Sequence, residues 1–175
     1  MTKKELRILM LKKRSEMNID LLFKQSESIV DQIRQDADYI KAKRVALFYP
    51  MQTEVNLLSL LEDQDKEFCF PKVCGSHLHF YPCDNNQSFI KSSFGVMEPQ
   101  GGKICDDHID YMLAPALAIS IDLYRIGYGK SFYDGFLQTH RPKKVMGVIY
   151  DFQLLNEIPH DEYDEVLDGY IKGNV

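Results

Sequence analysis

A ten-residue segment over 125–134, RIGYGKSFYD, combines residue types that bind phosphate. Gly127 and Gly129 let backbone N–H groups approach an anion, and the helix expected to follow points its positive N-terminus at the same place. Arg125 and Lys130 add positive charge, and Asp134 is a carboxylate suited to hold Mg²⁺ against a phosphate. The segment therefore favours phosphate binding, with a glycine-rich turn and a capping arginine as the structural alternative.

Two common nucleotide-binding motifs do not fit this segment. A P-loop needs a glycine five residues before Gly129, where Tyr124 stands. A dinucleotide fingerprint that starts at Gly127 needs its third glycine at the position of Phe132. The segment matches neither motif, but it keeps the features by which both bind phosphate: close glycines that expose backbone N–H groups and a helix N-terminus that follows them.

The elements that must position this loop follow from the hydrophobic pattern. Short apolar runs predict buried strands, and one alternating run predicts an edge strand. The strands are expected at 44–50, 67–71, 77–81 (the edge), 111–118 and 145–150. Helical spacing predicts helices over 3–17, from Asn18 or Asp20 to about 35, over 54–64 and over 131–140. Residues 84–108 suggest a surface excursion, and the acidic segment from 151 suggests a less regular tail.

This alternation predicts one α/β domain over 1–175. We expect a three-layer α/β/α sandwich with a mostly parallel, Rossmann-like sheet and an N-terminal helical arm. In open sheets of this kind, ligands bind beyond the carboxyl ends of the strands. Two loops should meet there, namely 49–54 after the first strand and 125–134 after the 111–118 strand.

Composition excludes several classes of protein. The chain has 175 residues, a net charge of −5 and 45% hydrophobic residues, which is ordinary for a globular domain and unsuited to general nucleic-acid binding. No apolar run approaches the ~20 residues of a membrane span, and the charged N-terminus does not fit a signal peptide. The spacing of the four cysteines does not fit a zinc site. We therefore expect a cytoplasmic protein with reduced thiols.

Further motifs accompany the loop in a fixed order along nearly the whole chain. They are 3–7 (KKELR), 43–46 (KRVA), 51–54 (MQTE), 94–99 (FGVMEP), 115–118 (PALA), 124–129 (YRIGYG), 132–134 (FYD) and 158–161 (IPHD). Together they resemble the signature of the 5-formyltetrahydrofolate cyclo-ligase family, also called 5,10-methenyltetrahydrofolate synthetases.

The resemblance implies an ATP- and Mg²⁺-dependent reaction of folate one-carbon metabolism. 5-Formyltetrahydrofolate becomes 5,10-methenyltetrahydrofolate, with release of ADP and phosphate. Phosphorylation of the formyl oxygen makes it a good leaving group, and N10 then closes the ring. The substrate is a small molecule, with or without a polyglutamate tail, and the expected assembly is a monomer or weak homodimer without nucleic-acid or membrane partners.

The resemblance also implies a role for particular residues. Nucleotide contacts are expected from Lys3, Lys4, Arg7, Arg14, Arg125, Gly127, Tyr128, Gly129, Lys130, Ser131, Phe132 and Tyr133. Folate contacts are expected from Tyr49, Met51, Glu54, Tyr128, Gly129, Lys130, Ser131 and Phe132, with Phe94 and Met97 as further walls. Arg125, Lys130 and Tyr133 are the expected catalytic residues, and Asp134 and Asp161 the expected Mg²⁺ ligands.

Two positions of the loop depart from the family pattern. Ser131 replaces a glycine, and we expect it to adopt negative φ and to donate its hydroxyl to a phosphate oxygen. Phe132 replaces a tyrosine. Two other classes remain open: a sugar-phosphate isomerase or acyl-CoA transferase with Glu54 or Glu98 as nucleophile, and a non-catalytic folate- or nucleotide-binding protein.

Overall fold

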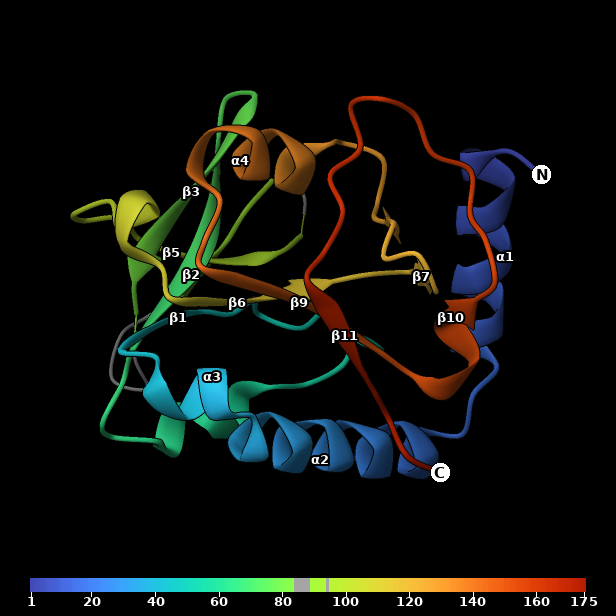
Figure 1. Cartoon of the computed structure of the whole chain (residues 1–175), viewed down its shortest axis with the longest axis horizontal. Coiled ribbons are helices and arrows are strands. Elements are labelled where there is room, and N and C mark those ends of the chain that lie inside the picture. Colours follow the sequence, from blue (N-terminus) through green and yellow to red (C-terminus); the bar gives the residue numbers. More distant parts are fainter. Residues whose placement is uncertain (84–88, 94) are drawn as a thin grey trace.

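A six-stranded sheet forms the centre of the protein, seen in a computed structural model that describes residues 1–83, 89–93 and 95–175 (Figure 1). Its strand order is β11-β9-β6-β1-β2-β3, and every neighbouring pair is parallel except β2 with β3. The strands are β1 (Arg44–Ala46), β2 (Glu67–Cys74), β3 (His77–Pro82), β6 (Tyr111–Pro115), β9 (Lys144–Ile149) and β11 (Gly169–Lys172). The predicted, largely parallel sheet with 77–81 at its edge is confirmed.

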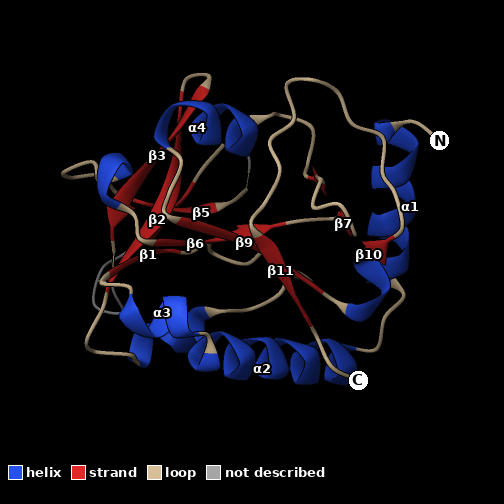
Figure 2. Ribbon diagram, in the orientation of Figure 1, coloured by secondary structure: helices blue, strands red, loops and turns tan. Residues whose placement is uncertain are grey.

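Helices cover both faces of this sheet, which confirms the three-layer prediction. Helices α2 (Ile19–Gln35) and α3 (Ala37–Lys41) lie on one face, and α4 (Phe132–His140) lies on the other (Figures 1 and 2). Three 3₁₀ turns connect the elements: η1 (Leu58–Glu62), η2 (Asp106–His108) and η3 (Asp151–Gln153). In the described part of the chain, no helix is both long enough and apolar enough to cross a bilayer.

The N-terminal helix α1 (Lys3–Ser15) is an arm that packs against a second, small sheet. Thr2 and Glu5 form a capping box that starts the helix. Its buried Leu6 and Met10 contact Ile126 and neighbouring apolar residues. The small sheet has the order β10-β7-β8, with β7 (Ala118–Ser120), β8 (Arg125–Ile126) and β10 (Leu154–Leu155). This packing fixes the basic side of α1 beside the loop that follows β8.

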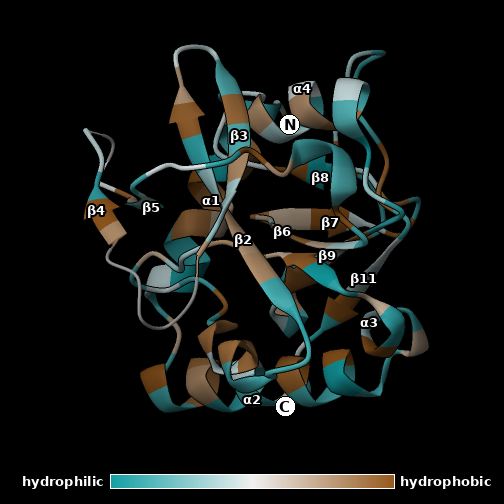
Figure 3. Cartoon of the chain, turned by 90° about the vertical axis from the view of Figure 1, so that its left-hand side faces the viewer, coloured by the Kyte–Doolittle hydropathy of each residue, from teal (hydrophilic) through white to brown (hydrophobic). Residues whose placement is uncertain are grey.

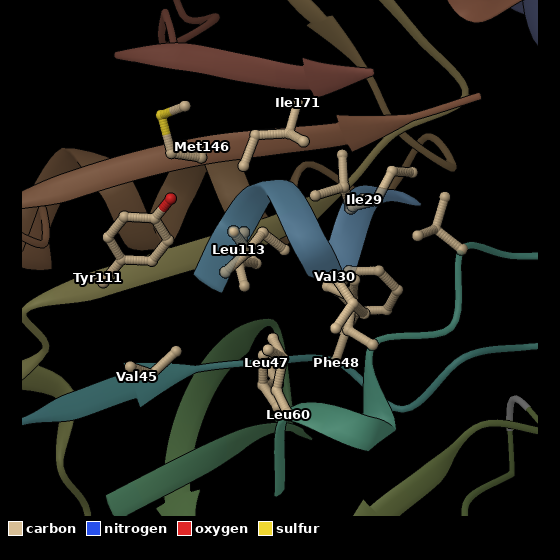
Figure 4. Close-up of a cluster of buried hydrophobic side chains, with 14 of the residues drawn as sticks. Ile29, Val30, Val45, Leu47, Phe48, Leu60, Tyr111, Leu113, Met146 and Ile171 are labelled. Atoms are coloured by element: carbon tan, nitrogen blue, oxygen red, sulfur yellow. The ribbon is translucent and has the colours of Figure 1, made fainter. Parts of the chain in front are cut away.

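The main core lies between the sheet and α2. Because strand side chains alternate, Val45 and Leu47 face α2, whereas Ala46 faces the α4 side. Figure 4 shows Ile29 and Val30 of α2 near Leu113 and Phe48. In Figure 3, tan to brown hydrophobic residues run through β6 and β7 in the middle of the molecule. The fully buried central strands form a rigid base for the loops at their ends.

Some sequence predictions about elements were wrong. The expected helix over 54–64 is only the short η1 turn, because side chains take the backbone donors before it: Asn56 N–H donates to Ser26 Oγ and Leu58 N–H to Asn56 Oδ1. The expected strand over 44–50 ends its ladder at Ala46.

The predicted strand over 111–118 is divided between two sheets. It leaves the main sheet after Pro115, and Leu117 N–H then donates to Ile126 O in the small sheet. Residues 84–108 are not only a surface excursion, since β4 (Phe89–Lys91) and β5 (Met97–Pro99) form an antiparallel pair. The tail also contributes β11, which pairs in parallel with β9.

Candidate functional site

A cavity of about 340 Å³ opens beyond the carboxyl ends of β1 and β6, where an open α/β sheet binds its ligands. The volume is within the range of small-molecule sites. The loop after β1, the loop between β8 and α4, β2, β5 and α1 all contribute side chains. The lining includes Lys3, Arg7, Tyr49, Met51, Glu54, Val73, Met97, Glu98, Arg125, Gly127, Tyr128, Gly129, Lys130, Ser131, Phe132, Tyr133, Asp134 and Asp164.

The cavity gathers most of the residues that the sequence singled out. Three of them lie outside its lining: Lys4 is exposed on α1, Arg14 is buried behind the cavity, and Asp161 is exposed on the loop before β11. Phe94 lies outside the described residues. The lining also contains Asp164 and Glu98. The sequence analysis assigned no site role to Asp164. The available signal was its position three residues after Asp161. Glu98 was considered only as an alternative nucleophile.

Each glycine of the loop makes room for an arginine. A Cβ on Gly127 would lie 2.8 Å from Arg125 Nη1, and a Cβ on Gly129 would lie 3.4 Å from Arg7 Cζ. Gly129 also has φ +99°, which favours glycine. Arg7 Nε donates to Gly127 O at 2.8 Å. The glycines therefore let two guanidinium groups pack closely on the loop backbone, just before the N-terminus of α4.

Arg125 is a cation held ready for an anionic ligand. Its Nη1 donates to Pro115 O at 2.7 Å, and its Cζ lies 5.0 Å from the centre of the Tyr133 ring. Burial lowers the pKa of the guanidinium, while the nearby Asp134 carboxylate opposes that shift. Within the described residues Arg125 forms no ion pair, so an anion in the cavity would supply its missing countercharge.

Ser131 does not have the backbone conformation expected from the sequence. Its φ is +56°, in the left-handed region, where it caps the start of α4 without a side-chain hydrogen bond to the helix. The prediction of negative φ was wrong, because the chain must reverse sharply from the glycine loop into α4. A non-glycine residue in this conformation costs about 1–2 kcal/mol.

Acidic groups lie beside these cations. Asp134, on the first turn of α4, accepts a hydrogen bond from Glu165 N–H at 3.2 Å. Lys3 Nζ pairs with Asp164 Oδ2 at 2.6 Å and with Asp161 Oδ2 at 3.2 Å. The described residues contain no cluster of three or more His, Cys, Asp or Glu side chains arranged to hold a metal. Two carboxylates do fit Mg²⁺ when phosphate oxygens and water complete its shell.

Glu54 marks the other end of the cavity. Its Oε1 accepts from Met51 N–H at 2.8 Å, and its Oε2 accepts from the Tyr128 hydroxyl at 3.0 Å. Burial raises the pKa of this carboxyl, opposed by these two hydrogen bonds and by Arg14. The Tyr49 ring packs at 4.9 Å from Phe89, so this end offers aromatic walls around one oriented carboxylate.

Fold and site together define an α/β enzyme with a cationic, glycine-rich loop on one side of its cavity and a half-buried glutamate on the other. The family model described as the 5-formyltetrahydrofolate cyclo-ligase family matches residues 1–172. The chain belongs to this family, and it is an enzyme of that family.

Curated relatives and solved structures agree with this assignment. The 5-formyltetrahydrofolate cyclo-ligase of Mycoplasma genitalium is 31% identical over 95% of this chain and 94% of its own length. The probable 5-formyltetrahydrofolate cyclo-ligase of Schizosaccharomyces pombe is 26% identical over 97% and 94%. The NMR structure of the 5,10-methenyltetrahydrofolate synthetase of Aquifex aeolicus matches with a TM-score of 0.88 and 30% identity, covering 98% of this chain and 90% of that one.

Proposed function

We propose that this enzyme converts 5-formyltetrahydrofolate to 5,10-methenyltetrahydrofolate with consumption of ATP and release of ADP and phosphate. In this reaction the formyl oxygen is phosphorylated, N10 attacks the activated carbon, and phosphate leaves as the ring closes. The protein must align two substrates and neutralise phosphate charge, and little covalent chemistry is required of its side chains.

The observation that carries the proposal is the polarity of one continuous cavity. Lys3, Arg7, Arg125 and Lys130 line the cavity around the glycine loop, whereas Glu54 and the aromatic ring of Tyr49 line it from the loop after β1. The cationic end suits a triphosphate, and the other end suits a flat, N–H-rich ring. A formyl oxygen between the two ends would meet the γ-phosphate, as the proposed transfer requires.

The residues around the glycine loop would bind the triphosphate and its Mg²⁺. Arg7 and Arg125, held against the loop backbone, bind phosphate oxygens together with the N–H groups around Gly129 and with Lys130. Tyr133, whose ring lies beside the Arg125 guanidinium, keeps that cation in place. Asp134 would hold Mg²⁺ together with Asp161 or with Asp164, the two carboxylates that pair with Lys3 on the loop before β11. The ion, when bound, neutralises phosphate charge.

The folate end orients the second substrate. The Glu54 carboxylate accepts hydrogen bonds from pterin N–H groups, and Tyr49, Met51 and Phe132 supply apolar walls. The proposal gives Lys130 and Ser131 a place between the two substrates, since both line the same cavity at the start of α4.

Product absorbance tests the proposal directly. The protein, 5-formyltetrahydrofolate, ATP and Mg²⁺ are mixed, and the methenyl product is followed in the near ultraviolet together with released phosphate. We expect one phosphate per methenyl group, and no product when ATP or Mg²⁺ is omitted. Binding of both substrates without turnover would contradict the proposal and favour a non-catalytic binding protein.

A further inference from the structure

Arg14 is a buried cation whose hydrogen bonds go to Thr53 and Tyr128, beside Glu54. It lies on α1 with 5% of its surface exposed, and it does not line the main cavity. We propose that Arg14 is a positioning residue for folate recognition, which acts through the Tyr128 hydroxyl to aim the Glu54 carboxylate. This inference rests on the proposed function, because it assigns Glu54 to the folate.

The hydrogen bonds form a directed relay. Arg14 Nη2 donates to the Tyr128 hydroxyl at 2.9 Å, and that hydroxyl donates to Glu54 Oε2 at 3.0 Å. Arg14 Nε donates to Thr53 Oγ1 at 2.9 Å, which fixes the guanidinium plane. Because the guanidinium can only donate and the ionised carboxylate can only accept, the Tyr128 hydroxyl accepts from Arg14 and points its own proton at Glu54. The orientation of the tyrosine thus depends on Arg14.

The relay leaves Glu54 able to bind a ligand. A carboxylate has about four acceptor positions, and the protein occupies one on each oxygen, from Met51 N–H and from Tyr128. The remaining positions are available to N–H donors in the cavity. Two fixed bonds, one on each oxygen, define the carboxylate plane, so the direction of those free positions is set before a ligand arrives.

Arg14 reaches this carboxylate from behind the binding site. A second, separate cavity of about 10 Å³ is lined by Arg14, Glu54, Tyr150 and Gln153 among others. It has room for about one water molecule, too little for any substrate group. Arg14 can therefore influence folate binding without touching the folate.

The charges around Glu54 give the relay its electrostatic role. The titratable groups that face it are Arg14 from α1, Tyr128 from the loop, Tyr133 from α4 and Tyr150 after β9. Arg14 is the cation among them. Burial raises the pKa of Glu54 and Arg14 opposes that rise. Loss of Arg14 should therefore protonate Glu54 at higher pH and remove an acceptor that the folate needs.

Arg14→Met tests this inference by two readouts. We expect the pKa of the Glu54 carboxyl, followed by ¹³C NMR, to rise by about one unit. We also expect KM for 5-formyltetrahydrofolate to rise about tenfold, with less than a threefold change in KM for ATP. Arg14→Lys keeps the charge and should give smaller changes. Lys13→Met removes an exposed cation from the same helix and should leave both readouts unchanged.

A second variant covers the case in which loss of the buried arginine unfolds the protein. Tyr128→Phe cuts the relay at a partly exposed residue and should raise the Glu54 pKa and the folate KM as well. If both single variants fold, the Arg14→Met/Tyr128→Phe double variant should show a folate KM no larger than the worse single variant, since they break one relay.

The failures of the two proposals are distinguishable. A wild-type protein that makes no methenyl product contradicts the proposed function, whereas the carboxyl titration still tests the relay. An unchanged Glu54 pKa in Tyr128→Phe and in folded Arg14→Met overturns the relay. A rise in KM for ATP alone in Arg14→Met would overturn it as well and return Arg14 to the nucleotide contacts.

Discussion

Lys3 Nζ lies 2.6 Å from Asp164 Oδ2, so one ion pair joins the first turn of α1 to the loop before β11. Both residues line the cavity. In Figure 1 this loop runs beside α1 before it returns to β11. Although burial by itself lowers the Lys3 pKa, the hydrogen bonds to Asp164 and Asp161 raise it overall, so the ammonium group stays charged at neutral pH.

Replacement of Lys3 by methionine should weaken nucleotide binding. The variant loses a cation at the phosphate end and leaves Asp161 and Asp164 unneutralised near a polyanion. We expect KM for ATP to rise about tenfold, equivalent to ~1.4 kcal/mol, and the folate KM to change less than twofold. Initial rates at varied ATP measure this. Lys12→Met, on an exposed position of the same helix, is the control, and equal effects of the two variants would show that only general surface charge matters.

Asp134→Asn should impair catalysis without unfolding the protein. An asparagine oxygen can still accept from Glu165 N–H, so the local structure keeps its bond while the charged Mg²⁺ ligand is lost. We expect kcat to fall about 10²-fold, or ~2.7 kcal/mol of barrier, with folate binding retained. Turnover across Mg²⁺ concentrations is the measurement. Parental turnover at every Mg²⁺ concentration would refute a metal role for this carboxylate.

Ser131→Gly should stabilise the protein. Glycine accepts the +56° φ without a Cβ penalty, and the serine side chain makes no capping bond that would be lost. We expect a gain of about 1 kcal/mol, or roughly 2–4 °C in Tm, with activity kept. Calorimetry of Ser59→Gly, an exposed site in η1 with ordinary φ, provides the comparison and should show lower stability. A lower Tm for Ser131→Gly would mean that the hydroxyl stabilises the loop.

Asp110 should contribute stability that depends on pH. Burial raises the pKa of its carboxyl, but hydrogen bonds from Arg44 N–H and Lys43 N–H and the ion pair with Lys143 outweigh this and lower it overall. A lowered pKa means that the contribution is complete above the unfolded value near 3.9 and is lost as pH falls through the folded value.

Urea unfolding of wild type and Asp110→Asn across acidic pH measures this contribution. We expect wild type to be about 1 kcal/mol more stable at pH 6, with the gap closing toward pH 3. Asp107→Asn, at an exposed carboxylate, should differ much less from wild type in its free energy of unfolding. A gap for Asp110→Asn that is independent of pH would indicate a steric effect instead.

The order of strands and helices was predictable because apolar periodicity reports burial directly. Residues 45–46 of β1 and 145–149 of β9 are buried and read as continuous apolar runs. The short η1 turn was not predictable, since Asn56 bonds to a residue on α2, thirty positions away. Likewise β11 has no apolar run of its own, and its strand conformation depends on pairing with β9.

Members of the candidate site could be predicted from the sequence where the side chain's charge and its motif indicate what it binds. Arg125 and Asp134 were singled out in this way and Glu54 through the family resemblance, and all three line the cavity. Asp164 and the location of Arg14 behind the site depend on how α1 docks, which no local pattern encodes. The φ of Ser131 is likewise set by the reversal between two elements and not by serine itself.

The sheet order has a consequence for how the protein is made on the ribosome. When residue 150 has just emerged, β9 has β6 on one side and an open edge on the other, because β11 is still to be synthesised. The exposed edge carries VMGVI, an uncharged apolar run of the kind that pairs with other chains. A nascent or truncated chain of this length would therefore expose an aggregation-prone strand edge before Asp164, which lines the cavity, and β11, which covers the edge, have been synthesised.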